Sequence, residues 1–282
     1  MSDPAELFRR YLEQRPELLQ GEIVLPRTVP QRRAERPRDG AAPQSPTLSG
    51  GAEPGPRRPA RRAEVRGSGW RSGAPPIPPR GIVAEAPASD LFSDDPLSGK
   101  SLDEIAEIVH SCTLCALCES RTNAVPGEGP GDARLVVVGE GPGAVEDETG
   151  RPFVGRAGEL LTDILAAIDL PRESVFICNV VKCRPPNNRK PQQDEIDRCV
   201  PYLYRQLEII RPAVILAMGG TAAEALLGVR QSLGGLRNKV HEFRGTPLVV
   251  TYHPAALLRN PHWKKPTWDD VRIARQLIDQ RR

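Results

Sequence analysis

The chain has few aromatic residues and lacks any long apolar run. Aromatic side chains account for 4% of its 282 residues. No stretch approaches the roughly 20 consecutive apolar residues that a membrane-spanning helix requires. The charged N-terminus also lacks the apolar core of a signal peptide. The sequence therefore gives no indication of membrane insertion or secretion, and we expect a cytoplasmic location.

The first hundred residues lack the apolar surface needed for a core. The chain has 30 prolines and 25 glycines, concentrated toward this end. Between residues 21 and 80, twelve arginines stand against five acidic residues, and Trp70 is the single aromatic. So little apolar surface cannot offset the entropy lost on ordering the chain. We therefore predict a disordered Pro/Gly/Arg-rich linker over residues 21–100, preceded by a short amphipathic helix over residues 1–20.

Arginine pairs in this segment leave two interpretations open. Arg57-Arg58 and Arg61-Arg62 either hold nucleic acid weakly through its phosphates or keep a linker solvated. The N-terminal tail is accordingly expected to contact nucleic acid or a protein partner, or to act only as a spacer.

Residues 101–282 alternate between short apolar runs and helical patterns. The runs, at 134–138, 175–178, 213–217 and 247–251, are typical of buried parallel strands. Helical patterns cover 157–168, 192–210, 221–227 and 268–280. This alternation predicts a three-layer α/β/α sandwich around a central four-stranded, mainly parallel sheet.

Polar residues follow three of the four predicted strands. Glu140 comes after the first strand, Asn179 closes the second, and His253 follows the fourth, while Gly219-Gly220 follows the third. Ligands of open parallel sheets bind beyond the carboxyl ends of the strands. The four loops are therefore expected to form one site, suited to a small planar ligand.

Six cysteines in a cytoplasmic protein favour metal or cluster ligation over disulfides. Cys112 and Cys115 form a C-x2-C pair, and the distant Cys183 and Cys199 allow a four-ligand site. Cys118 extends the pair into a ferredoxin-like triplet and is an alternative ligand. Thiolates suit either zinc or an iron-sulfur cluster, and the spacing alone does not decide between them. The remaining cysteine, which lies in a predicted strand, is expected to be a small buried apolar residue.

A nucleotide-binding enzyme is disfavoured. The segment Gly139-Glu-Gly-Pro-Gly143 follows a strand, but it matches neither G-x-G-x-x-G nor G-x4-G-K-[ST]. Pro142 also removes a backbone N–H that a phosphate loop would use.

Four short segments and four cysteines occur here in an order that resembles the family 4 uracil-DNA glycosylases. These are base-excision enzymes that carry a [4Fe-4S] cluster. The segments are Gly139-Glu-Gly-Pro-Gly143, Gly150-Arg-Pro-Phe-Val-Gly155, Asn179 and His253-Pro-Ala-Ala-Leu-Leu-Arg-Asn260. The resemblance implies a glycosylase domain over residues 101–282 that flips uracil out of DNA and hydrolyses its N-glycosidic bond. It also places the cluster ligands at Cys112, Cys115, Cys183 and Cys199.

The same resemblance implies roles for residues around the base. Phe153 would stack on the flipped uracil, and the Asn179 carboxamide would read its N3/O4 edge. His253 would donate to O2 as negative charge builds there. Glu140, together with the loop backbone at Gly141, would position the attacking water. Glu146 or Asp147 would lie near the C5 edge of the base.

Contacts with DNA are expected on two surfaces. Leu257, Leu258 or Arg259 would fill the gap left by the flipped base. A cluster-supported surface of Lys182, Arg184, Arg189 and Lys190 would face phosphates, or else would merely solvate a Pro-rich loop. The protein is expected to act as a monomer, associated with the nucleoid if bacterial, with a tail that contacts nucleic acid or a repair or replication partner.

The same scaffold permits two other functions. A non-catalytic iron-sulfur protein that binds nucleic acid is the alternative function, although such a protein has no need of Phe153, Asn179 and His253 together. The glycosylase branch that traps abasic DNA covalently is disfavoured, because the basic, His-containing loop expected after the third strand is absent.

Overall fold

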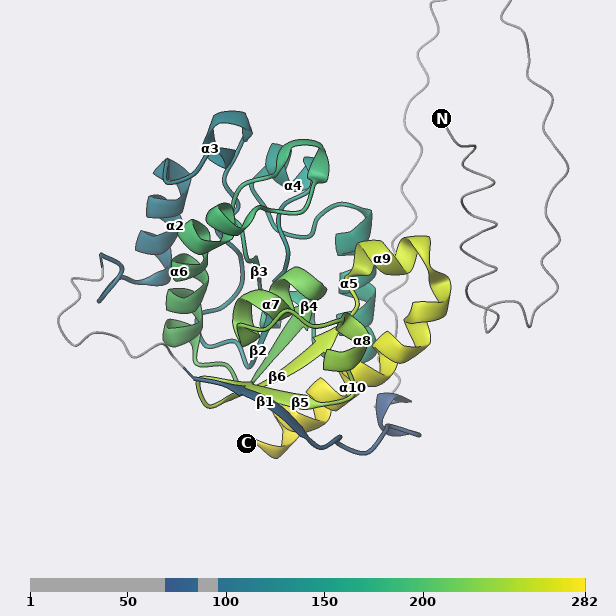
Figure 1. Ribbon diagram of the computed structural model, residues 1–282. Helices are drawn as coiled ribbons and strands as arrows, with labels where there is room; N and C mark the ends of the chain where they lie inside the picture. Colours follow the sequence, from purple (N-terminus) through teal and green to yellow (C-terminus); the bar gives the residue numbers. More distant parts are fainter. Residues whose placement is uncertain (1–68, 86–95, 282) are drawn as a thin grey trace, which may run out of the picture. The chain divides into compact units, whose positions relative to one another are not determined.

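The computed structural model describes residues 69–85 and 96–281. The helix predicted over residues 1–20 lies outside this part of the chain. Figure 1 shows a central sheet with helices on both faces. The sheet has six strands in the order β1-β5-β6-β4-β2-β3. Their bounds are β1 (Arg80–Ala84), β2 (Leu135–Gly139), β3 (Phe176–Asn179), β4 (Val214–Met218), β5 (Val240–Phe243) and β6 (Thr246–Thr251).

The four predicted strands are confirmed and are parallel. β2 pairs with β3 and with β4, and β4 pairs with β6. All five residues of β2 are buried, and they alternate between the two faces: Val136 and Val138 belong to one core cluster, and Leu135 and Val137 to the other. Burial on both faces explains why these strands appear in the sequence as continuous apolar runs.

Helices complete the three layers. The core on one face contains buried residues of α2, α3, α6, α7 and α8, and the core on the other contains residues of α5 and α10. The helices are α2 (Leu102–Ser111), α3 (Leu117–Ser120), α4 (Ala144–Thr149), α5 (Arg156–Ala167), α6 (Gln193–Ile210), α7 (Gly220–Leu227), α8 (Leu233–Leu236), α9 (Pro254–Arg259) and α10 (Lys264–Gln280). Short 3-10 turns are η2 (Gly69–Arg71), η3 (Arg172–Ser174), η4 (Pro186–Asn188) and η5 (Pro261–Trp263). Over residues 69–85 and 96–281, no helix is long and apolar enough to cross a membrane.

The sheet has two strands more than predicted, and β5 is one of them. It forms an antiparallel hairpin with β6, in which Phe243 pairs with Thr246 across Arg244-Gly245. Both turn residues have positive φ, +47° and +80°, as a tight hairpin turn requires. Only alternate residues of β5 are buried. The strand therefore lacks the continuous apolar run that marks β2, β3, β4 and β6.

The other additional strand, β1, corrects the predicted linker. β1 lies in the segment 69–85, which was predicted to be linker, and pairs in parallel with β5. In the same segment Trp70 is only 3% exposed and packs in the core beside α10. The Trp70 indole N–H donates to Asp169 Oδ2 at 3.1 Å. Residues 96–100 are also placed, with Leu97 buried. This segment is too poor in apolar residues to form a core of its own. It is ordered by contacts with the sheet and the core of the domain. The rest of the predicted 21–100 linker lies outside the described residues.

Candidate active site

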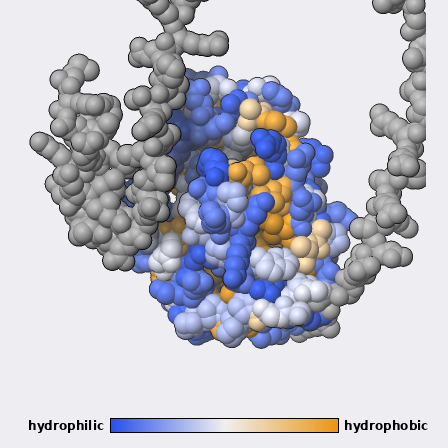
Figure 2. Space-filling model, turned by 90° about the vertical axis from the view of Figure 1, so that its right-hand side faces the viewer, coloured by the Kyte–Doolittle hydropathy of each residue, from blue (hydrophilic) through white to orange (hydrophobic). Residues whose placement is uncertain are grey.

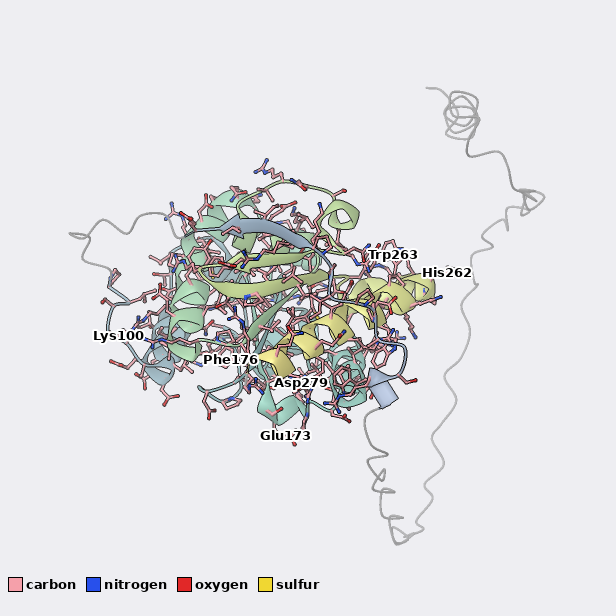
Figure 3. All side chains as sticks on the ribbon, turned by 90° about the horizontal axis from the view of Figure 1, so that it is seen from below. Lys100, Glu173, Phe176, His262, Trp263 and Asp279 are labelled. Atoms are coloured by element: carbon pink, nitrogen blue, oxygen red, sulfur yellow. The ribbon has the colours of Figure 1, made fainter. Side chains whose placement is uncertain are left out.

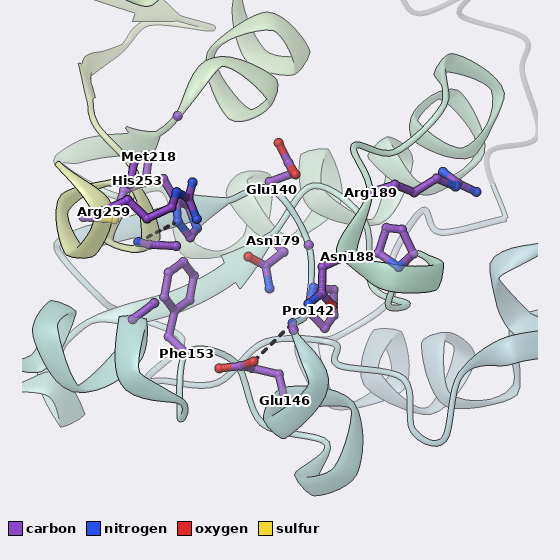
Figure 4. Close-up of a pocket in the computed structure, with 17 residues that line it drawn as sticks. Glu140, Pro142, Glu146, Phe153, Asn179, Asn188, Arg189, Met218, His253 and Arg259 are labelled. Carbon is purple, nitrogen blue, oxygen red and sulfur yellow. Dashed lines mark hydrogen bonds between the residues drawn. The ribbon is translucent and has the colours of Figure 1, made fainter. Parts of the chain in front are cut away.

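One pocket opens at the carboxyl edge of the parallel strands, as predicted. Its volume of about 340 Å³ falls in the range of small-molecule sites. Loops after β2, β3, β4 and β6 all contribute to its wall, and Figure 4 shows Phe153, Asn179 and His253 gathered on one side of it. Eight predicted site residues line it: the six expected around the base, Glu140, Gly141, Glu146, Phe153, Asn179 and His253, and two expected at the DNA, Arg189 and Arg259. Sequence reasoning did not anticipate Pro185, Asn188 or Met218.

Asn179 ends β3 with its amide in the pocket wall. The residue is 1% exposed, and its Oδ1 atom has no hydrogen-bond partner among the described residues. A buried carbonyl without a donor costs about 1–3 kcal/mol. Gly139, at the end of the neighbouring strand β2, makes room for it: a Cβ there would overlap Asn179 Oδ1 and lie 2.5 Å from Phe153 Cζ. The pocket therefore contains a buried amide whose oxygen accepts no hydrogen bond from the described residues.

Phe153 is held in a strained backbone conformation. Its φ of +51° is rare for a non-glycine residue and costs on the order of 1–3 kcal/mol. Arg172 stabilises this turn by donating to Phe153 O at 2.9 Å and to Pro152 O at 2.6 Å. Gly158 also permits it, because a Cβ there would overlap the Phe153 carbonyl. The ring is 4% exposed and forms a fixed wall of the pocket.

His253 caps α9 and lies against the Phe153 ring, with 5.4 Å between ring centroids. Its Nδ1 atom accepts the Ala255 backbone N–H at 3.2 Å. Burial lowers the pKa of His253 to about 4, and the positive charge of Arg259 adds to the effect, while Glu146 opposes it. The imidazole is therefore neutral at pH 7. Because Nδ1 is an acceptor, the proton of the neutral ring is on Nε2.

The two carboxylates of the pocket have different surroundings. Glu146 accepts the backbone N–H groups of Val154 and Gly155 at 2.9 Å each, and that of Gly143 at 3.1 Å. Both of its oxygens therefore tie the loops together. The Oε2 atom of Glu140 accepts the Thr221 hydroxyl at 2.6 Å, and its other oxygen has no hydrogen bond within the described part of the chain.

Two neighbours of these carboxylates differ from expectation. Asp147 is buried and accepts the Thr122 backbone N–H at 2.9 Å, so it does not reach the pocket. Thr221, at the start of α7, was missed. The hydroxyl that follows Gly219-Gly220 at a strand-to-helix junction was the signal that could have identified it.

The predicted DNA-contacting loop after His253 is only partly exposed. Leu257 is 1% exposed in the core, so in this conformation it is not available as a wedge. Leu258 is 40% exposed, and Arg259 is exposed and lines the pocket. Residues three apart lie on the same face of a helix, and in α9 the face that contains Pro254 and Leu257 packs on the core.

The predicted basic surface is also corrected. Lys182 is buried and donates to Asn179 O at 2.9 Å and to Gln206 Oε1 at 2.7 Å. Arg189 lines the pocket but forms a two-pronged ion pair with Glu195, and Lys190 pairs with Glu224. Arg184 donates to Asn188 Oδ1 and does not line the pocket. Among the described residues, Lys182 and Arg184 have no acidic partner, but Lys182 is buried, so of the four only Arg184 remains as an unpaired cation at the surface.

Five cysteines line a second, smaller hollow between α2, α3 and α6. They are the four predicted ligands, Cys112, Cys115, Cys183 and Cys199, together with Cys118. All are free thiols. Within the described ranges, no three His, Cys, Asp or Glu side chains are close enough together to hold a single metal ion. Cys178 is elsewhere, buried in β3, as expected.

Hydrogen-bond donors point at the sulfurs of this hollow. Arg121 donates to Cys183 Sγ at 2.9 Å, the Lys182 backbone N–H to Cys199 Sγ at 3.2 Å, and the Tyr202 hydroxyl to Cys112 Sγ at 3.4 Å. Burial raises the pKa of the Cys199 thiol to about 12. Donors of this kind suit thiolates that bind a cationic group.

Comparison with known proteins agrees with this geometry. Residues 126–274 match the family model described as the uracil DNA glycosylase superfamily. A type-4 uracil-DNA glycosylase of Thermotoga maritima is 50% identical over 181 residues, which are 63% of this chain and 94% of the relative. Those of Sulfurisphaera tokodaii and Pyrobaculum aerophilum are 47% and 46% identical, over 63% and 57% of this chain and 84% and 86% of theirs. The chain therefore belongs to the uracil-DNA glycosylase superfamily and, within it, to the type-4 uracil-DNA glycosylases.

Proposed function

We propose that the protein removes uracil from DNA by hydrolysing the bond between N1 of the base and C1′ of deoxyribose, leaving an abasic site. The observation that carries this proposal is the buried, unpartnered amide of Asn179 in the pocket wall. A base inside the duplex cannot reach such an amide, so the nucleotide must be flipped out. Uracil N3–H would supply the missing donor to Oδ1, and O4 would accept from Nδ2. Cytosine presents the opposite pattern at this edge.

Charge that develops on the departing base is stabilised by His253. In the neutral tautomer Nε2–H is a donor, and the Phe153 ring, tilted 31° to the imidazole, packs against it and limits its rotation. We assign this donor to uracil O2, where negative charge builds as the glycosidic bond breaks. The free oxygen of Glu140 is the group proposed to position the water, held in place through Thr221. We place Gly141 and Glu146 in the walls around the base, and Arg259 and Leu258 at the DNA.

The cysteine hollow fits a [4Fe-4S] cluster. A single zinc ion requires four ligands around one point, whereas a cluster presents a separate iron to each thiolate. We propose Cys112, Cys115, Cys183 and Cys199 as ligands, with Cys118 as the alternative. N-glycosidic hydrolysis transfers no electrons, so when bound the cluster would supply a covalent link between α2–α3, the β3–α6 loop and α6. Lys182 lies between this hollow and the pocket, since its ammonium group binds the Asn179 carbonyl.

The proposed activity predicts base release that discriminates between uracil and cytosine. We expect single-turnover release from an oligonucleotide with one deoxyuridine, and release at least about 10⁴-fold slower from the matched deoxycytidine strand, because a mispaired amide is costly. Free base is measured by chromatography, and abasic sites by alkaline cleavage. A folded, iron-containing protein that released neither base would favour the non-catalytic binding protein.

The cluster proposal predicts that iron and stability are lost together. Cys199→Ser should remove most of the bound iron and lower the melting temperature, because it deletes a ligand on α6. Cys178→Ala is the matched control: this buried thiol lies outside the hollow, so iron content should stay at the wild-type level. Cys118→Ala tests the alternative ligand. A folded, iron-free and fully active Cys199→Ser protein would contradict the structural role.

A further inference from the structure

Trp263 is the outer member of a stack of three side chains. Its ring lies on Tyr252, with centroids 4.6 Å apart and planes 9° from parallel. The guanidinium of Arg237 lies 4.5 Å from the Tyr252 centroid. Buried Asp270 accepts two hydrogen bonds from Arg237, at 2.7 and 3.0 Å, and fixes the inner end of the stack. Trp263 itself is 37% exposed. A large aromatic ring is thus held in one orientation at the surface.

This stack adjoins residues that line the active-site pocket. Tyr252 immediately precedes His253, and η5, which contains Trp263, directly follows α9. Arg259, at the end of α9, lines the pocket. Figure 3 shows Trp263 and His262 together at one end of the domain. The face formed by α9 and α10 is mostly hydrophilic, with a band of apolar residues (Figure 2).

The cations around Trp263 differ from those across the pocket. Arg259, Lys264 and Lys265 are all exposed, and none forms an ion pair within the part of the chain that the structure describes. Arg189 and Lys190, by contrast, are neutralised by acidic partners. The nearby acidic residues are occupied, Asp269 by Arg272 and Asp270 by Arg237. Unpaired cations beside an exposed aromatic ring match the composition of surfaces that bind single-stranded nucleic acid.

We propose that Trp263, Arg259, Lys264 and Lys265 hold the DNA strand that flanks the flipped nucleotide. Trp263 stacks on an unpaired base, and the cations contact its phosphates. This inference rests on the proposed function for its substrate. Because only an unstacked base offers its face to the Trp263 ring, the surface contributes more to binding of single-stranded DNA than of duplex DNA.

The test is binding of a labelled, uracil-free single-stranded oligonucleotide to the full-length, iron-containing protein. Trp263→Ala should raise Kd about tenfold, while Trp263→Phe, which keeps a stacking face, should stay close to wild type. Lys264→Ala with Lys265→Ala should reduce the slope of log Kd against log salt by about 0.7 for each phosphate that is no longer neutralised. Arg211→Ala is the matched control, an exposed cation that precedes β4 at the opposite edge of the sheet. It should leave the slope unchanged.

A second measurement keeps the proposal testable if Trp263→Ala does not fold. The other two tryptophans, Trp70 and Trp268, are buried or partly buried. Quenching of tryptophan fluorescence by DNA should therefore disappear in Trp263→Phe. Wild-type quenching in that variant, or wild-type Kd and salt slope in the alanine variants, would overturn the proposal. Uracil release by the wild type, assayed in parallel, tests the proposed function separately, so failure of either proposal is recognised without the other.

Discussion

Replacing His253 by alanine is expected to slow single-turnover uracil release by about 10²–10³-fold, with little change in affinity for uracil-free DNA. A donor aimed at developing charge is worth this much because it acts in the transition state and not in the bound ground state. His253 meets the requirement: Nδ1 is occupied by the Ala255 N–H, so Nε2–H is left as a donor in a ring fixed against Phe153. His253→Gln, which retains an N–H donor, should recover part of the rate.

The pH dependence of the reaction provides an independent check on His253. Its pKa of about 4 lies below the ordinary value of 6.5. The wild-type rate should therefore show no inflection near pH 6.5. Between pH 6.5 and 4, His253 is protonated in the unfolded chain but stays neutral in the folded protein. The free energy of unfolding therefore decreases as the pH falls through this window. His253→Ala should lose this part of the acid sensitivity. An inflection near 6.5 that disappears in the variant would contradict a neutral donor.

The sequence was most informative where a residue's environment follows from local pattern. Continuous apolar runs located β2, β3, β4 and β6, because strands covered on both faces need apolar residues at every position. The carboxyl-edge rule then placed Glu140, Asn179 and His253 in one pocket. Strand β5 was missed because only one of its faces is buried. Strand β1 and Trp70 were missed because the pairing of β1 with β5 and the burial of Trp70 both depend on elements that are distant in sequence.

Side-chain partners were less predictable than positions. The sequence placed Glu146 in the pocket, but it does not reveal that both carboxylate oxygens are used by backbone N–H groups. Lys182 was taken for a surface cation because its charge is visible in the sequence, whereas the acceptors that allow its burial, Gln206 and the Asn179 carbonyl, lie on other elements. Arg172 donates to the Phe153 carbonyl from nineteen positions away in the sequence, and no sequence motif indicates this contact.

Asn179→Ala is expected to reduce uracil release by about 10²-fold or more without lowering the free energy of unfolding. The amide of Asn179 thus favours uracil release but does not favour folding. Loss of the amide removes hydrogen bonds to the base, and a site built to bond a polar edge discriminates strongly through them. In the free protein the same amide is buried with an unpartnered Oδ1, a cost of about 1–3 kcal/mol that the substitution relieves and that offsets the small cavity it creates.

Gln206→Ala is the matched control for this prediction. Gln206 is an amide as deeply buried as Asn179, at 2% exposed, but both ends are bonded, to Lys182 Nζ at 2.7 Å and to Pro126 O at 2.8 Å. Its removal leaves a buried ammonium short of an acceptor and should lower stability by several kcal/mol. Chemical denaturation measured beside single-turnover kinetics separates the cases. If Asn179→Ala proved as unstable as Gln206→Ala, the amide would be structural. If it instead folded and released uracil normally, the base would be read elsewhere in the pocket.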